Sequence, residues 1–182
     1  MSLGFSEENV PLERAIERLH KKGMIMVAAA GNCNNGDGGG DEGGDGDEEE
    51  GPTPACDPSQ TSVKYPAAYF GVIAVAAMDD NDQVAYYSLS GPEIIVAAPG
   101  GEKTGEQILS TAKGGGYARG SGTSQATAHV AGAVALALQR KPQLTFVETR
   151  DLIQVTAEHL GYPATQQGAG LIDVQRMLES LQ

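Results

Sequence analysis

The chain contains no tryptophan, few other aromatic residues, and no apolar run long enough to cross a membrane. Aromatic residues make up 5% of its 182 residues, which fits one domain with a core of small aliphatic side chains. Basic residues are scarce as well, because 12 Lys and Arg stand against 24 Asp and Glu, for a net charge of −12. That balance argues against nucleic acid or an anionic membrane as a partner. No signal-peptide pattern opens the chain.

Cysteine is equally scarce: Cys33 and Cys56 are the only two, and they flank a stretch rich in glycine and acid. Eight acidic residues and no basic residue lie between them, so we expect an acidic, solvated insert at about 33–57. A disulfide between the two cysteines and a pair of unrelated thiols both remain open. The carboxylates suit calcium, but their spacing fits no defined calcium loop, which favours a plain acidic tract.

Apolar stripes of helical spacing alternate with short, wholly apolar runs, and this pattern predicts an α/β fold. Asn9 is suited to cap a helix with Pro11 in its first turn, and Gly23 stands where a C-terminal glycine cap belongs. The run 24–30 then predicts a parallel strand buried on both faces. Further strands are expected at 72–77, 94–98 and 107–111, and further helices at 123–139, from the capping box Thr145–Glu148 to about 156, and at 173–181.

The segment from Gly122 to Gly132 carries the strongest chemical signal. A glycine, two hydroxyl residues and then small apolar residues place Ser124 at the N-terminus of a helix. Unpaired N–H groups and the positive end of the helix dipole stabilise developing negative charge there. A helix-capping hydroxyl is the plain alternative. The small residues that follow favour a nucleophile, because they let neighbouring backbone enclose the helix and deliver Ser124 to a cleft.

Asn32 is the natural companion of this serine. It follows the apolar run 24–30, and ligand sites in open α/β sheets gather at the carboxyl ends of strands. Its amide is suited to donate to the oxyanion of an acyl transfer, beside the backbone N–H of Ser124. An ordinary Gly-Asn turn is the alternative interpretation.

None of the three histidines is placed to act as a general base for Ser124. His129 follows five residues later, about 140° around the helix and about 7.5 Å along it, so we expect a buried structural histidine. His20 falls in what we expect to be a solvated last helical turn, and His159 lies in a loop-like segment. The chain therefore carries a nucleophile without a base.

The chain resembles the C-terminal part of a subtilisin-like serine protease (subtilase) catalytic domain, over residues 1–182 apart from the insert. This resemblance implies a partial subtilisin-like α/β fold, with a mostly parallel sheet flanked by helices and the N-terminal strands missing. It also implies a serine endopeptidase. The landmarks that carry it are Ser2-Leu3-Gly4, Ala28-Ala29-Ala30-Gly31-Asn32, Tyr65-Pro66-Ala67, Val72 to Val75, Ser88 to Gly100 and Gly122 to Gly132.

By the same resemblance, Ser124 is the nucleophile and Asn32 the oxyanion donor. A segment of three residues is expected to pair with the substrate backbone, and three more to line the pocket for the residue before the scissile bond. The resemblance implies that no cofactor is required, and the carbonyls near residues 67, 69 and 72 resemble a weak calcium site. The two substrate-binding groups are Ser2, Leu3, Gly4 and Ala29, Ala30, Gly31, respectively.

The departures from the family pattern shape the expected function. Subtilases carry the catalytic Asp and His upstream of this region, so we expect the chain alone to be inactive and to need an upstream segment or a complementing chain. An exposed apolar face or unpaired sheet edge should mark that missing part. Gln125 and Ala128 stand where methionine and proline are common. A secreted enzyme acting on peptide or protein substrates is implied; the alternative is a catalytically inactive subtilase-like binding module.

Overall fold

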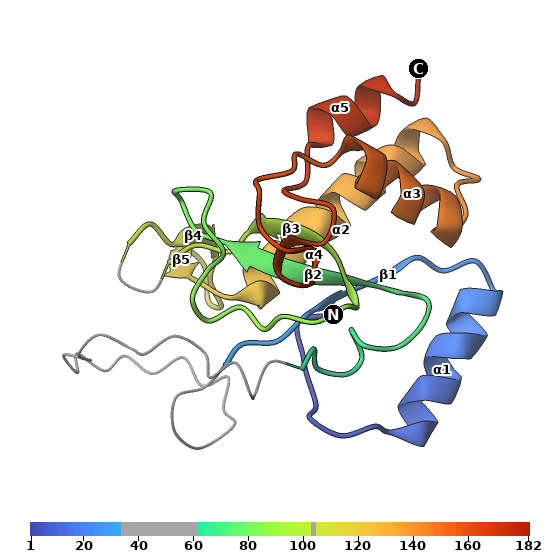
Figure 1. Cartoon of the computed structure of the whole chain (residues 1–182), viewed down its shortest axis with the longest axis horizontal. Helices are drawn as coiled ribbons and strands as arrows, with labels where there is room; N and C mark the ends of the chain where they lie inside the picture. Colours follow the sequence, from blue (N-terminus) through green and yellow to red (C-terminus); the bar gives the residue numbers. More distant parts are fainter. Residues whose placement is uncertain (34–61, 103–104) are drawn as a thin grey trace.

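A parallel three-stranded sheet lies at the centre of the computed structural model, which describes residues 1–33, 62–102 and 105–182. The strands are ordered β1-β2-β3 (Figure 1). Every residue of β1 and β2 is buried, as expected for strands covered on both faces. The α/β class is thereby confirmed. The strand bounds are Met26–Ala29 for β1, Val72–Met78 for β2 and Ile94–Pro99 for β3.

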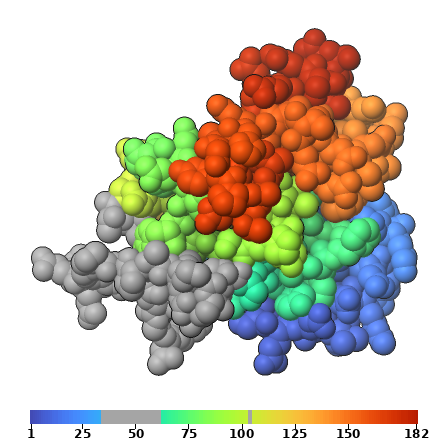
Figure 2. All heavy atoms as spheres, viewed as in Figure 1, coloured from blue at the N-terminus to red at the C-terminus, as the bar shows by residue number. Residues whose placement is uncertain are grey.

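Helices cover both faces of this sheet. Alternate strand residues, such as Ile73 and Val75, pack into one core cluster with the buried sides of α2, α3 and α5. The intervening residues, such as Ala74 and Ala76, face a second cluster that includes Ile16 of α1. Figure 2 shows the C-terminal residues gathered at one end of the molecule, opposite the N-terminal residues. The helices span Val10–Lys21 (α1), Thr123–Arg140 (α2), Phe146–Thr156 (α3) and Val174–Glu179 (α5).

The predicted helix ends match the local hydrogen bonding. The Asn9 side chain accepts from the N–H of Leu12 at the start of α1, and Gly23 follows the helix with a φ of 81°. Thr145 and Glu148 form the expected capping box at the start of α3, because each side chain bonds the backbone of the other residue. Hydrogen bonds from the backbone and the hydroxyl of Thr145 lower the pKa of Glu148 below its ordinary value.

Replacing Thr145 by alanine should lower the free energy of unfolding by about 1 kcal/mol, because an N-cap is lost. The Glu148 carboxylate contributes its stabilisation above its ordinary pKa and loses it as pH falls through the lowered folded-state pKa. Urea unfolding of the wild type and Thr145→Ala at neutral and acid pH measures both effects. Thr145→Ser keeps the cap and is the control; a Thr145→Ala penalty that grows on acidification would contradict the account.

Two short elements were not predicted. β5 (Tyr117–Gly120) pairs antiparallel with β4 (Ile108–Thr111), and Gly114, Gly115 and Gly116 between them all have positive φ. α4 (Ala164–Gln167) is followed by Gly168, which packs against the backbone of β3. At Gly168, a Cβ would stand 2.3 Å from the carbonyl carbon of Ile95. These elements depend on pairing across the chain, which local pattern does not reveal.

The prediction that α2 is enclosed is wrong for one side of the helix. Its buried side packs on all three strands, while the opposite side is exposed over several turns. His129 lies on this exposed side, with Nδ1 3.0 Å from the carbonyl oxygen of Gln125, so the expected buried histidine is also wrong. We call the exposed residues the uncovered face of α2: Ala128, His129, Ala131, Gly132, Ala135 and Leu136.

Two further expectations concern the cysteines and the membrane. Cys33 is disulfide-bonded, and Cys56, the sequence's other cysteine, lies outside the described residues, as does nearly all of the acidic insert and any calcium site in it. Among the helices described, none has the length and apolar character needed to span a bilayer.

Candidate active site

The carboxyl end of β1 and the amino end of α2 meet through Asn32. Its Oδ1 accepts two hydrogen bonds from Thr123, one from the backbone N–H at 3.0 Å and one from the hydroxyl at 2.8 Å. The Thr123 hydroxyl in turn accepts from the N–H of Gly31 at 3.3 Å. Because Oδ1 is held by Thr123, the orientation of the Asn32 amide is fixed, and its Nδ2 donor lies on the other branch of the amide.

Ser124 is the second residue of α2 and is partly exposed. Its N–H belongs to the first helical turn, whose amides have no acceptor within the helix, so positive charge concentrates there. Since Thr123 precedes it directly, the Thr123–Asn32 bonds bring the amide of Asn32 to the same helix end. The structure thus brings together the two residues that the sequence singled out.

Gly122 separates the two groups and leaves space between them. A Cβ built on Gly122 would stand 3.1 Å from Asn32 Nδ2 and 3.0 Å from Gln125 Oε1. The Gly122 N–H donates to the carbonyl of Gly100 at 2.9 Å, which ties the loop before α2 to the end of β3. Any side chain at position 122 would therefore enter the space in front of the Asn32 amide.

Tyr87 contacts the loop after β3 to which Gly122 is bonded. The ring is buried, and its hydroxyl donates to the carbonyl of Gly101 at 2.6 Å. Burial raises the pKa of Tyr87 well above its ordinary value, so the hydroxyl stays protonated and remains a donor at physiological pH. A Cβ on Gly100 would stand 2.8 Å from this hydroxyl and 2.5 Å from the Ala77 Cβ, which explains the glycine there.

The first of the two groups expected to bind substrate lies next to Ser124. Ser2, Leu3 and Gly4 are exposed, and the Ser2 hydroxyl donates to the Ser124 carbonyl at 3.2 Å. This contact places the N-terminal segment beside the start of α2.

The second group, Ala29, Ala30 and Gly31, leads directly to Asn32. Ala29 and Ala30 are buried, with exposed fractions of 4% and 0%, while Gly31 is partly exposed. Gly31 is therefore the member of this group that offers surface to a ligand.

Within the described part of the chain, no hydrogen bond or ring contact joins any of the three histidines to Ser124 or Asn32. His20 packs edge-on against Phe70 and Phe146, with ring centroids 5.5 Å and 4.9 Å away, so its ring is only partly exposed, although Arg18 and Lys21 of the same turn are exposed as expected. His159 accepts from the N–H of Gly161 and lies 3.2 Å from Gln167 Nε2. Both histidines have structural contacts away from α2's first turn, and His129 lies on the uncovered face of α2.

A family model described as the Subtilase family matches residues 1–171. The chain belongs to the subtilase family. It is 39% identical over 176 residues to a thermostable alkaline protease of Halalkalibacterium halodurans, covering 97% of this chain and 40% of that protein. Subtilisin E of Bacillus subtilis is 38% identical over 175 residues, covering 96% and 39%.

A solved protease structure supports the same fold. Proteases from Pseudoalteromonas arctica match with a TM-score of 0.80 and 30% identity, covering 100% of this chain and 50% of that chain. The subtilase chain described here thus spans about two fifths of the curated relatives and half of the solved structure. The fold is accordingly part of a larger one, as the resemblance implied.

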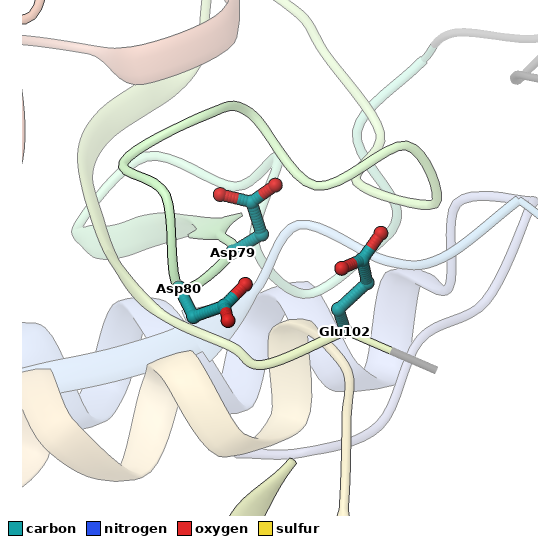
Figure 3. Close-up of side chains that lie close together, drawn as sticks. All are labelled: Asp79, Asp80 and Glu102. Atoms are coloured by element: carbon teal, nitrogen blue, oxygen red, sulfur yellow. The ribbon is translucent and has the colours of Figure 1, made fainter. Parts of the chain in front are cut away.

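Two features of this subtilase chain were not predicted from its sequence. The first is the role of Thr123, which holds the Asn32 side chain in place. The only sign of this role in the sequence was a second hydroxyl residue directly before Ser124. Asp79, Asp80 and Glu102 form an acidic cluster whose ligand atoms lie within 4.8 Å of one another (Figure 3). Asp79 already accepts from the backbone of residues 81 and 83, which accounts for it as a turn residue.

Alanine at two glycines of the α2 region should have opposite effects. Gly122→Ala should lower the free energy of unfolding by about 1 kcal/mol or more, because φ is 156° and the methyl would crowd Asn32 and Gln125. Gly132→Ala should raise it by up to about 1 kcal/mol, because the methyl would meet nothing within 4 Å and alanine favours helix. Denaturant unfolding of this chain measures both; equal effects of the two changes would contradict the structure.

Proposed function

We propose that this chain is the C-terminal part of a subtilase catalytic domain and works as the nucleophile half of a serine endopeptidase. The observation that carries the proposal is the pair of hydrogen bonds from Thr123 to Asn32 Oδ1, which brings the Asn32 amide to the helix end that bears Ser124. A peptide carbonyl placed there would meet a hydroxyl and two N–H donors. Neither residue alone would support this conclusion.

In the proposed reaction, Ser124 Oγ attacks the carbonyl carbon of the scissile peptide bond and gives its proton to a base. The oxyanion that forms accepts from the Ser124 N–H and from Asn32 Nδ2, both fixed before the substrate arrives. The carbon–nitrogen bond then breaks, the amine takes the proton, and water hydrolyses the acyl-enzyme. Side chains, backbone and water suffice for these steps, so no cofactor is included; calcium would have only a structural place.

We assign the base to a segment upstream of this sequence, and the uncovered face of α2 is where that segment would pack. This face consists mainly of small residues, with Leu136 45% exposed, and Gly132 leaves open space for a close neighbour. The larger size of the relatives supports such a segment. By the same resemblance, the site of action is extracellular. Ser2, Leu3 and Gly4 would pair with the substrate backbone, and residues 29–31 would flank the preceding side chain.

A fluorophosphonate probe tests the nucleophile. With the upstream segment present, the probe should label Ser124, Ser124→Ala should abolish labelling, and Thr127→Ser, the control for a hydroxyl deeper in α2, should not. Asn32→Ala should lower kcat by about 10²–10³, a magnitude that was measured in a subtilisin and is therefore a family value. This chain alone should cleave peptides negligibly, because triad members act as a unit.

No labelling of Ser124 in the completed protein would overturn the proposal. If that protein bound peptides tightly without labelling or cleavage, the inactive binding module would be the better description.

The covering of α2 has its own test. Gly132→Leu should reduce recovery of activity when the upstream segment is added to this chain by at least about tenfold, because the side chain fills the space left for that segment. Val155→Leu, a change at an exposed residue of α3, is the control. Mixing experiments with probe labelling as the readout measure both, and unchanged recovery with Gly132→Leu would show that the segment packs elsewhere.

A further inference from the structure

Lys64 lies between the two segments that we propose to hold the substrate. A Cβ on Gly4 would stand 3.0 Å from the Lys64 Cβ, and a Cβ on Gly31 would stand 2.6 Å from the Lys64 Cγ. The stem of the lysine therefore packs directly against the α-carbon regions of both glycines. A side chain that enters between these segments meets Lys64.

Backbone hydrogen bonds fix Lys64 in this place. Its N–H donates to the carbonyl of Ala30 at 2.8 Å. The next residue, Tyr65, exchanges two hydrogen bonds with Phe5, at 2.8 Å and 3.0 Å. The segment 64–65 thus pairs with residues next to both proposed substrate-binding segments. These bonds hold Lys64 between the two segments.

The charge of Lys64 is not neutralised within the described part of the chain. Its Nζ donates to the Ser6 hydroxyl at 2.9 Å, a neutral partner. No described carboxylate lies within 4.0 Å of Nζ; the described ion pairs involve Lys21, Arg150 and Arg176. An ammonium group whose exposed partner is a neutral hydroxyl can exchange that partner for a carboxylate, which makes a stronger, charge-assisted hydrogen bond.

We propose that Lys64 makes this site selective for an acidic side chain on the residue before the scissile bond. The inference rests on the proposed function, which places that residue between 2–4 and 29–31. The aliphatic part of the Lys64 side chain takes up the space that a large apolar substrate side chain would need. The ammonium group of Lys64 attracts a substrate carboxylate that comes within hydrogen-bonding distance. A basic side chain at the same position meets a like charge.

The test compares peptides that differ only at that position, with the upstream segment present. Glutamate should exceed its neutral isostere glutamine in kcat/KM by about fivefold or more, and the advantage should shrink as salt rises. Lys64→Met should remove the advantage, Lys64→Arg should keep it, and Lys64→Glu should shift the preference toward lysine. Lys141→Met, which removes an exposed charge at the far end of α2, should leave the glutamate-to-glutamine ratio unchanged.

Probe labelling separates the two ways to fail. If Ser124 is labelled but glutamate shows no advantage, or if Lys64→Met leaves the advantage intact, the selectivity is wrong and the proposed function stands. If Ser124 is not labelled and no peptide is cleaved, both are wrong. A ratio restored by arginine and lost with methionine supports a charge effect, because a purely structural role would affect both peptides alike.

Discussion

Two hydrogen bonds from Thr123 to the Asn32 side chain hold the proposed chemistry of this chain together. They join the end of β1 to the start of α2 across a sequence separation of 91 residues. Asn32 follows the carboxyl end of the buried strand β1, and Ser124 lies at the positive amino end of α2. The two ends stabilise one developing negative charge only where they lie side by side. Without the Thr123 contacts, the Asn32 amide would be free to rotate, and a donor must be fixed beforehand to favour a transition state.

Small residues make this meeting possible. The sheet is rich in alanine, and glycine stands at two close contacts around the site. Gly100 fits between Ala77 and Tyr87, while Gly122 leaves the space in front of the Asn32 amide. The scarcity of aromatic residues noted in the sequence follows from the same requirement, since large rings would separate β2 and β3 from α2. One side of α2 is exposed in the described part of the chain.

Much of the fold was predictable, because buried parallel strands and capped helices leave local signals. The run before Asn32, the cap at Asn9 and the capping box at Thr145 each gave the right element. β5 was missed because it forms by pairing with β4, and the residues of β5 show no alternation of apolar and polar side chains that would predict a strand. His129 was misplaced for a related reason: the small residues of α2 predict a close neighbour, and the described part of the chain supplies one on a single side only.

The most direct measurement is a crystal structure of the completed protein with a phosphonate bound to Ser124. The account predicts one phosphonyl oxygen within about 2.7–3.1 Å of both Asn32 Nδ2 and the Ser124 backbone nitrogen, with Asn32 Oδ1 still bonded to Thr123. A phosphonyl group that points away from Asn32, or an Asn32 side chain released from Thr123 in that complex, would contradict it.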